Sequence, residues 1–240
     1  MSRLTRWVDK TFYPNYPKFW DDLMLRNRVL SVLTQEMDLL DLGAGRGNRD
    51  ELDFSGACRF VAGVDLDEAV LDNPYLTEAR LQAPPDFTIP YEDQRFDLVV
   101  CNNVLEHVER PGEFFTEVRR VLKPGGIFIG KTPNRHHYVP FVSRLLPQSV
   151  HVWYNELRGR EAQDTFPVVY ACNTDKSVRA FAAEANMDVS RIDIVEGRPE
   201  YLRLTFPSYL IGLAYERTVN ASPILRNFRG VLIIELRKPD

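Results

Sequence analysis

Four short apolar runs in the first half of the chain predict buried β-strands. They read "DLLDLG", "RFVAGVDLD", "RFDLVVCNN" and "IFIGKTP". Each run is six to nine residues long and is bounded by turn-forming or polar residues, as expected for strands covered on both faces. The runs occupy residues 38–43, 59–67, 95–103 and 127–133.

Two intervening or flanking segments carry apolar residues at helical spacing instead. Residues 18–36 place Phe19, Leu23, Val29, Leu30 and Leu33 on one side of a predicted helix. Residues 111–126 place five apolar side chains on one face, with a proline suited to the first turn and "PGG" to end the helix. Those five are Phe114, Phe115, Val118, Val121 and Leu122.

Alternation of strands and helices through residues 38–133 predicts an α/β fold with a doubly wound, mostly parallel sheet. We expect a single domain over 1–240, with residues 1–37 forming an N-terminal arm and helix. Residues 134–172 and 197–229 do not continue the alternation of strands and helices, and they are interpreted as two insertions. Other predicted elements are a short strand near 79–82, helices at 173–186 and 207–220, and strands at 188–195 and 230–237.

Composition narrows the class of protein. The chain is 44% hydrophobic and 27% charged, with a formal net charge of -4, so it lacks the overall basic field of many nucleic-acid-binding proteins. Cys58, Cys101 and Cys172 are far apart and form no CxxC pair, which favours buried thiols in a reducing compartment. Since the start of the chain has no apolar signal core and no run is long enough to span a bilayer, we expect a cytoplasmic protein.

The stretch "LLDLGAGRGN" at 39–48 holds the most informative pattern. Its alternating glycines suit close approach of a ligand to the backbone. A phosphate-binding P-loop needs GxxxxGK[ST], which is absent. A dinucleotide fingerprint needs GxGxxG, but Asn48 stands at the sixth position counted from Gly43. Neither phosphate motif is complete.

The carboxyl group of Asp41, two residues before the first glycine, disfavours a pyrophosphate and favours a cationic ligand. S-adenosylmethionine meets this requirement, because it carries an ammonium and a sulfonium and no phosphate. Asp65, at the end of the second predicted strand, suits the two ribose hydroxyls of either S-adenosylmethionine or NAD. This acid therefore indicates an adenosine ligand without deciding between them.

The blocks "LLDLGAGRGN", "VAGVDLD" and "FDLVVCNNVLEHV", followed by "VLKPGG", resemble the signatures of class I S-adenosylmethionine-dependent methyltransferases. The resemblance covers about 38–134 and is strongest to small-molecule enzymes such as the ubiquinone-biosynthesis and sugar O-methyltransferases. It implies a Rossmann-like, seven-stranded sheet whose last strand is antiparallel. It also implies S-adenosylmethionine as cofactor and S-adenosylhomocysteine as product.

The same resemblance implies where the cofactor lies. Its methionine part would follow the loop backbone at Gly43, Ala44, Gly45 and Gly47, with Asp41 near the ammonium group. Asp65 would meet the ribose, Leu66 the adenine, and Asn102 and Asn103 the far side of the cofactor. The family's acid at the adenine amino group has no clear counterpart, so Gln82-Ala83 and Asp86 both remain candidates.

Methyl transfer to a hydroxyl needs a base to take its proton, and His107 is the candidate. The alternative is that Glu106 and His107 only open the next helix. Some relatives bind magnesium through a carboxylate where this chain has Asn103, so we predict no metal site.

The acceptor is expected to be a small molecule or a glycan- or lipid-linked one, methylated at oxygen. Residues 134–172 are aromatic and basic, and we interpret them as a lid in which Arg158 and Arg160 hold an anionic group, or else as a solvated loop. Histidines 136, 137 and 151 lack partners with zinc-binding spacing. Nucleic acid is not expected, because "CNNV" replaces the Asn-Pro-Pro-aromatic motif and no cysteine follows a proline.

Three alternatives stay open at this point. Residues 201–228 could form a core helix over the sheet or an amphipathic surface that meets a membrane. The chain could also be a nicotinamide-dependent oxidoreductase. Finally, it could bind S-adenosylmethionine without catalysis. The sequence does not predict an oligomeric state.

Overall fold

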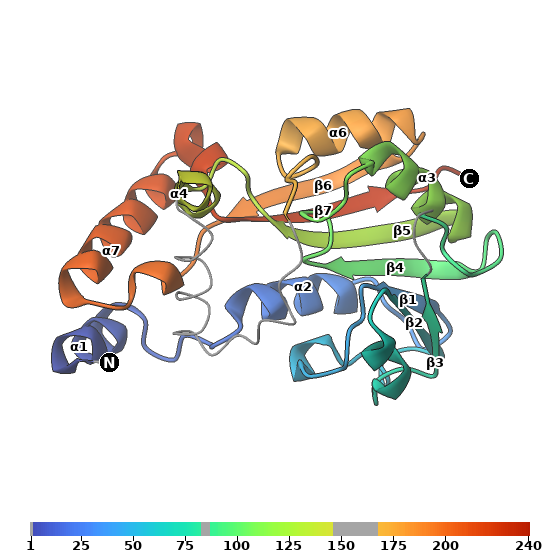
Figure 1. Ribbon diagram of the computed structural model, residues 1–240, viewed down its shortest axis with the longest axis horizontal. Coiled ribbons are helices and arrows are strands. Elements are labelled where there is room, and N and C mark those ends of the chain that lie inside the picture. Colours follow the sequence, from blue (N-terminus) through green and yellow to red (C-terminus); the bar gives the residue numbers. More distant parts are fainter. Residues whose placement is uncertain (1, 83–86, 146–167) are drawn as a thin grey trace.

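A seven-stranded sheet with the order β3-β2-β1-β4-β5-β7-β6 forms the centre of the computed structural model, which describes residues 2–82, 87–145 and 168–240 (Figure 1). Neighbours among β1 to β5 pair in parallel, and β7 is antiparallel to both β5 and β6. The predicted fold class is confirmed. The strands are β1 Asp38–Leu42, β2 Phe60–Asp65, β3 Glu78–Leu81, β4 Phe96–Asn102, β5 Leu122–Pro133, β6 Asp188–Val195 and β7 Val231–Arg237.

Helices cover both faces of this sheet. Alternate residues of β1 point to opposite sides, so Leu39 packs with α2 while Leu40 and Leu42 pack with α3 and α6. The first cluster is the smaller, and the second holds the aromatic side chains of α3. The helices are α1 Arg3–Phe12, α2 Trp20–Leu30, α3 Pro111–Val121, α4 Tyr138–Leu145, α6 Asp175–Glu184 and α7 Phe206–Ala221; short 3-10 turns are η1 Asp50–Leu52, η2 Glu68–Asp72, η4 Glu200–Leu202 and η5 Pro223–Phe228.

The expected alternation of strand and helix is wrong for two connections, the one from β1 to β2 and the one from β2 to β3. Only η1 connects β1 to β2, and only η2 connects β2 to β3. The connecting segments, "GNRDELDFSG" and "DEAVLDNP", are rich in Asp, Asn, Gly and Ser, which favour turns over helix interiors. Helix α3 also ends at Val121 rather than at 126, because β5 already begins at Leu122 and passes through "KPGG".

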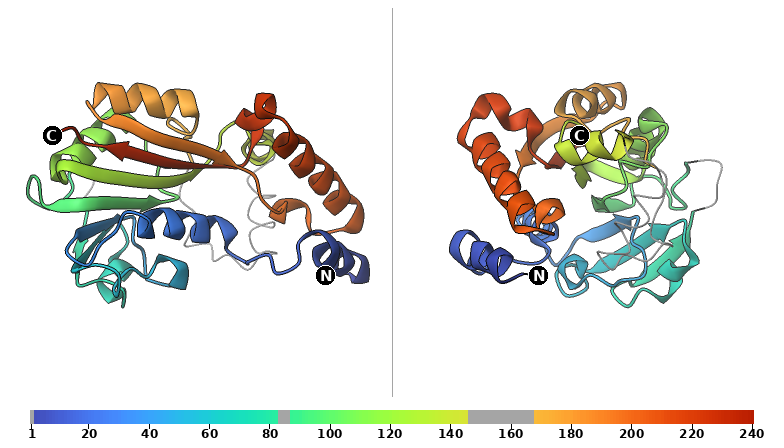
Figure 2. Two further views of the ribbon diagram at one scale, coloured as in Figure 1. Left: turned by 180° about the vertical axis from the view of Figure 1, so that it is seen from behind. Right: turned by 60° about the vertical axis from the view of Figure 1, so that its left-hand side comes forward.

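Two elements lie at the periphery of the molecule. Residues 3–12, at the start of the expected N-terminal arm, form a helix, α1. Of the two alternatives for residues 201–228, a core helix over the sheet is wrong, because α7 packs against α1, η4 and η5. Figures 1 and 2 show α1 and α7 together at one end of the molecule, beyond the carboxyl ends of β4, β5 and β6. The short-range hydrophobic pattern does not reveal which element covers a helix, so the packing of α7 could not be predicted from it.

Among the described residues, no helix combines the length and the apolar character that crossing a bilayer requires.

The buried carboxylate of Asp38 stabilises the opposite end of the sheet, where β1 begins. Asp38 accepts two hydrogen bonds from Arg59, at 2.9 and 2.7 Å, and a further one from Arg95. These interactions, first of all the hydrogen bond from Arg59, hold the pKa of Asp38 below its usual value although burial opposes this. Its stabilising contribution is therefore present above about pH 4 and is lost as the pH falls further.

Replacing Asp38 with asparagine should lower the free energy of unfolding by about 2 kcal/mol, because the arginines lose their shared anion. Urea denaturation at neutral pH measures the change. Asp93→Asn is the matched control, since it removes a pair to Arg120 whose carboxylate is 71% exposed, and it should cost under about 1 kcal/mol. Equal losses in the two variants would contradict the assignment.

Candidate active site

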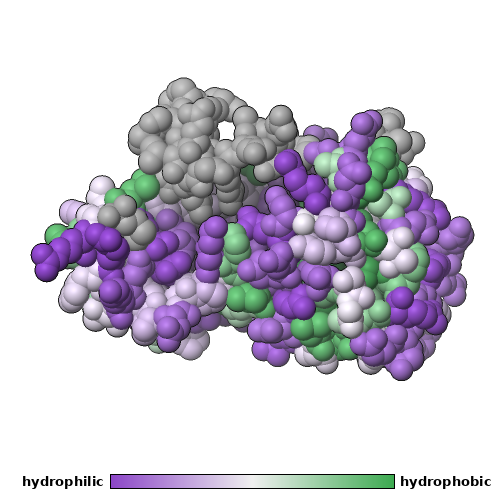
Figure 3. Space-filling view, turned by 90° about the horizontal axis from the view of Figure 1, so that it is seen from below, coloured by the Kyte–Doolittle hydropathy of each residue, from purple (hydrophilic) through white to green (hydrophobic). Residues whose placement is uncertain are grey.

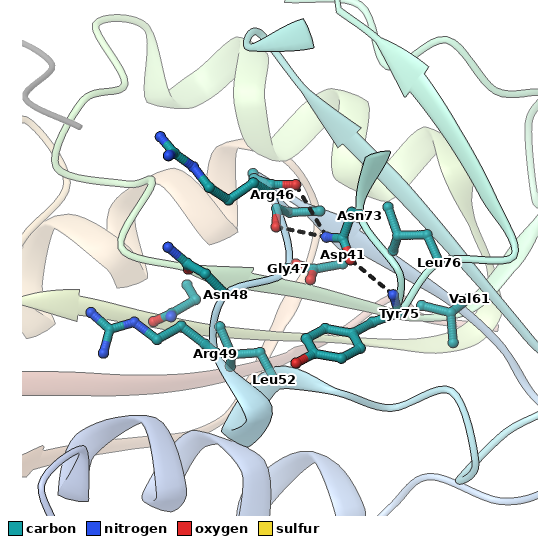
Figure 4. A pocket seen from close by; sticks show the side chains of 14 residues that line it. Asp41, Arg46, Gly47, Asn48, Arg49, Leu52, Val61, Asn73, Tyr75 and Leu76 are labelled. Carbon is teal, nitrogen blue, oxygen red and sulfur yellow. Dashed lines mark hydrogen bonds between the residues drawn. The ribbon is translucent and has the colours of Figure 1, made fainter. Parts of the chain in front are cut away.

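A pocket opens at the carboxyl end of β1, where the glycine loop turns away from the sheet (Figure 4). Its volume is about 170 Å³. Six of the residues singled out from the sequence line it: Asp41, Gly43, Ala44, Gly45, Gly47 and Asn102. The structure therefore brings the loop and the end of β4 together around one cavity.

The glycines of the loop have different tasks. Gly43 has a φ of +83°, and a Cβ there would lie 2.2 Å from the side chain of Val104. Gly45 has a φ of +53°, but a Cβ there would meet nothing within 4 Å. Gly43 thus allows the loop to pack against the segment after β4, while Gly45 leaves bare backbone beside open space.

Two side chains hold the loop in place. Asn73 donates hydrogen bonds through Nδ2 to the carbonyl oxygens of Ala44 and Gly45, both at 3.1 Å (Figure 4). Asp65 accepts a hydrogen bond from the Gly45 N–H at 2.8 Å and another from the Asp67 N–H at 3.0 Å. The acid expected at the ribose is therefore joined directly to the loop expected at the methionine part.

Asp41 is the buried charge of the pocket. Only 7% of the residue is exposed, and it lies on the same face of β1 as Leu39. Burial, followed by the nearby negative charge of Asp65, raises the pKa of Asp41 to about 7. A cation placed in the pocket would favour the ionised form of this carboxyl.

A buried polar chain leads from α2 to the pocket. Lys131 of β5 is fully buried and donates to Asp21 at 2.8 Å and also to Asp22. Asp22 in turn accepts a hydrogen bond from Nδ2 of Asn102 at 3.2 Å. Among the described residues, Oδ1 of Asn102 is buried without a hydrogen-bond partner. Asn102 lines the pocket, and because Asp22 orients its amide, it keeps an unused acceptor of fixed orientation there.

Five of the described residues proposed from the sequence do not line this pocket, and His107 is one of them. Asp65 contacts it only through Gly45. Leu66 is 55% exposed after β2, and Asn103 is exposed with a φ of +55°. The backbone N–H of Gln82 donates to the carbonyl of Asp65 at 2.9 Å, which places Gln82 beside the end of β2. Asp86 lies outside the described residues.

His107 sits in a turn rather than at the start of a helix. Its backbone N–H donates to Val104 at 2.9 Å, and α3 begins only at Pro111. The neighbouring Glu106 is buried and accepts a hydrogen bond from Thr132 at 2.9 Å. The interpretation that Glu106 and His107 open the next helix is therefore wrong, while the proposed role of His107 as a base stays a prediction.

The histidines of the first insertion are partly outside the described residues. His137 packs its ring against Tyr138 and Tyr215, at 4.1 and 5.6 Å between centroids, and its Nε2 lies 3.2 Å from Glu196. His137 thus joins α4 to α7. His151, Arg158 and Arg160 are not described. In the described ranges, no three His, Cys, Asp or Glu side chains gather into a metal-binding group.

Several pocket residues escaped the sequence interpretation. Arg46 and Arg49 extend from the loop to the same side of the view in Figure 4, and Tyr75 lies across the pocket from them. Two arginines within a loop expected to hold an amino acid were a signal for carboxylate binding. Asn73 carried no such signal, because its role depends on how the segment after β2 folds back onto the loop.

Comparison with known proteins gives this pocket its context. Residues 40–130 match the family model described as a methyltransferase domain. A protein of Mycolicibacterium smegmatis named probable S-adenosylmethionine-dependent methyltransferase is 32% identical over 143 residues, which is 55% of either chain. A ubiquinone biosynthesis O-methyltransferase of Coxiella burnetii is 31% identical over 138 residues, 51% of this chain and 58% of the relative. The match thus spans little more than half the length of these curated relatives.

Similarity of structure extends further along the chain. An S-adenosylmethionine-dependent methyltransferase from Methanosarcina mazei superposes with a TM-score of 0.56 over 88% of this chain and 97% of its own, at 15% identity. Residues 40–130 therefore form a methyltransferase domain, and the sheet that contains them has the class I methyltransferase fold. The resemblance expected from the sequence is confirmed for this part of the chain.

Proposed function

We propose that the whole chain is a methyltransferase that uses S-adenosylmethionine and methylates an oxygen of a small-molecule acceptor. One observation carries the proposal: a buried carboxyl group, that of Asp41, lines the glycine-loop pocket and has a pKa raised to about 7. A site for a pyrophosphate would gain nothing from this acid. A site for the ammonium group of S-adenosylmethionine gains a charge-assisted hydrogen bond.

The amino-acid end of the cofactor matches the charges around the pocket. Asp41 and Oδ1 of Asn102 are the acceptors for the ammonium group. Arg46 and Arg49, on the loop itself, line the pocket and are the cations proposed to meet the carboxylate. Gly45 supplies the open backbone between these groups. Acceptors on one side and cations on the other fit a zwitterion.

The adenosine end is assigned to the far side of the loop. Each carboxylate oxygen of Asp65 accepts one backbone hydrogen bond, so each keeps a lone pair for a ribose hydroxyl. Leu66 follows directly and presents an exposed apolar side chain for the adenine. Gln82, bonded to the Asp65 backbone, is the described candidate for the adenine edge.

Transfer is a direct displacement. The acceptor oxygen attacks the methyl carbon, the carbon–sulfur bond breaks, and its electron pair leaves with S-adenosylhomocysteine. The proton of the hydroxyl must pass to a base, for which His107 is proposed because it follows the strand that ends at the pocket. Alignment of the acceptor supplies the remaining acceleration. The name of the Coxiella relative, a ubiquinone biosynthesis O-methyltransferase, favours oxygen as the acceptor atom.

Segments at the carboxyl edge of the sheet are proposed to select the acceptor. The described parts of the two insertions, α4 and α7, lie beyond that edge (Figure 2). A lid over residues 134–172 with Arg158 and Arg160 on an anionic group remains a proposal, as does a glycan- or lipid-linked acceptor.

Calorimetric titration tests the cofactor. S-adenosylmethionine and S-adenosylhomocysteine should bind with micromolar affinity, and NAD should give no heat. NAD binding without S-adenosylmethionine binding would establish the oxidoreductase alternative instead. An acceptor screen scored by S-adenosylhomocysteine release then separates an enzyme from a protein that binds the cofactor without turning it over.

A further inference from the structure

Helices α1 and α7, with the turn η4, form an outer lobe of residues 3–18 and 199–221. Figures 1 and 2 place it at the end of the molecule toward which β4, β5 and β6 point. Its interior contains Val8, Tyr13 and Tyr209, all buried. Tyr209 donates to Asp9 at 2.5 Å, and Arg203 pairs with Asp9 at 2.8 Å. The lobe therefore has its own small hydrophobic core and its own hydrogen bond and ion pair at Asp9.

The outer surface of α1 is apolar where a surface helix is normally polar. Leu4 and Trp7, one turn apart, are each 52% exposed, and Phe12 is 39% exposed with its ring 6.0 Å from that of Trp7. The inward face is taken by Thr5 and Val8. The packing of α1 on α7 therefore does not account for the outward apolar side chains. Helix α7 adds two more to the lobe: Leu210 is 39% exposed and Ile211 is 67% exposed.

Cations flank these apolar side chains. Arg3, Arg6 and Lys10 repeat along α1 beside Leu4 and Trp7, and all three are exposed. At the left-hand end of Figure 3, which holds α1, hydrophilic and hydrophobic atoms lie side by side.

The acids of the lobe face inward instead. Asp9 is bonded to Tyr209 and Arg203, Glu200 to Arg203, and Glu216 to Tyr13. In a chain whose formal net charge is -4, the outside of this lobe is consequently positive. This separation of exposed cations from inward-facing acids favours an anionic partner.

We propose that α1 docks on the surface of an anionic lipid bilayer. Leu4 and Trp7 enter the boundary between headgroups and acyl chains, and Arg3, Arg6 and Lys10 contact the lipid phosphates. The cations argue against a second copy of this chain as the occupant, because a symmetric contact between two α1 helices would bring like charges together.

Docking gives the acceptor a location. The lobe lies beyond the carboxyl ends of the strands (Figure 1), and the glycine-loop pocket is lined by residues at the carboxyl ends of β1 and β4. Together with the proposed methyl transfer, docking implies that the acceptor is an amphipathic molecule anchored in the membrane. Only this statement about the acceptor rests on the proposed function. Binding to lipid needs no turnover, so its measurement is independent of the proposed function.

Co-sedimentation with vesicles tests the docking surface. The full chain should sediment with vesicles of equal parts phosphatidylcholine and phosphatidylglycerol, bind vesicles of pure phosphatidylcholine far more weakly, and be released by 0.5 M salt. The variants Leu4→Ser/Trp7→Ser and Arg6→Glu/Lys10→Glu should each lower the partition coefficient by about tenfold or more. Leu71→Ser is the matched control, since Leu71 is 55% exposed on η2, away from the lobe, and should bind as the unmodified chain does.

Circular dichroism and S-adenosylmethionine titration establish that the variants are folded. Absence of binding to anionic vesicles would overturn the proposal, as would equal binding by all variants. Light scattering adds a third outcome against it: a dimer that dissociates in the Leu4→Ser/Trp7→Ser variant would make the apolar face a contact between copies.

Discussion

Replacing Asp41 with asparagine should weaken the binding of S-adenosylmethionine about a hundredfold at pH 7.5. The variant keeps the size of the side chain but removes the only charge proposed to meet the ammonium group, and losing one partner of a buried charged pair costs about 2–5 kcal/mol. Calorimetry measures the dissociation constant. The fold should be unaffected or stabilised, because the carboxyl group is buried beside Asp65, a second acid.

The same group predicts how affinity varies with pH. The pKa of Asp41 is about 7, because burial and then Asp65 oppose its ionisation. The ammonium group of the ligand requires the ionised form, so below pH 7 binding must release a proton. Affinity should therefore fall by up to about tenfold per pH unit between pH 7 and pH 5. In Asp41→Asn this dependence should disappear.

Stability in the absence of ligand should show the opposite trend. A carboxyl group whose pKa is raised on folding stabilises the fold below about pH 4 and loses that contribution as the pH rises through 7. Asp41→Asn should flatten this part of the profile.

Methylthioadenosine provides the control ligand for Asp41. It keeps the adenosine and the sulfur but has no ammonium group, so Asp41→Asn should leave its affinity unchanged. An equal loss of affinity for both ligands would show that the variant disturbs the pocket as a whole. Unchanged affinity for S-adenosylmethionine would remove Asp41 from the proposed site.

Replacing Lys131 with methionine should have the largest effect on stability, lowering the free energy of unfolding by about 3 kcal/mol. Lys131 is fully buried and bonded to Asp21 and Asp22 of α2. Although burial alone would raise the pKa of Asp21, the ammonium group of Lys131 holds it below its usual value. Without Lys131, two carboxylates remain at the packed start of α2. Urea denaturation reports the loss.

A compensated variant distinguishes lost charge pairing from lost packing. Lys131→Met combined with Asp21→Asn and Asp22→Asn should recover to within about 1 kcal/mol of the original stability, because no uncompensated charge remains. If the triple variant is as unstable as the single one, packing around Lys131 rather than charge is responsible.

The sheet could be predicted because each strand carries its own signal. Asp38–Leu42 and Phe96–Asn102 are short apolar runs buried on both faces, and their order along the chain fixes a parallel arrangement. Helix α1 could not be predicted in the same way. Its outward apolar side chains, Leu4 and Trp7, do not indicate a core-facing helix, and its partner α7 lies about two hundred residues away.

The candidate site likewise contains some residues that a local motif predicts and others that only the folded chain brings together. Asp41 and the glycine loop are neighbours in sequence, so a short motif contains both their position and their chemistry. The chain from Lys131 through Asp22 to Asn102 joins residues 109 and 80 positions apart. Each is an ordinary polar residue in its own segment. Only the folded sheet makes Asn102 an oriented acceptor, so no local pattern could identify it.

The hydrogen bonds from Asn73 to the carbonyls of Ala44 and Gly45, and from the Gly45 N–H to Asp65, have an entropic consequence. A glycine-rich loop has more conformational freedom than other sequences, and fixing a residue costs about 1–2 kcal/mol. Here the fold itself meets that cost, through side chains on the neighbouring strand and turn. A ligand entering beside Gly45 finds the loop preorganised, so more of its contact energy remains as affinity.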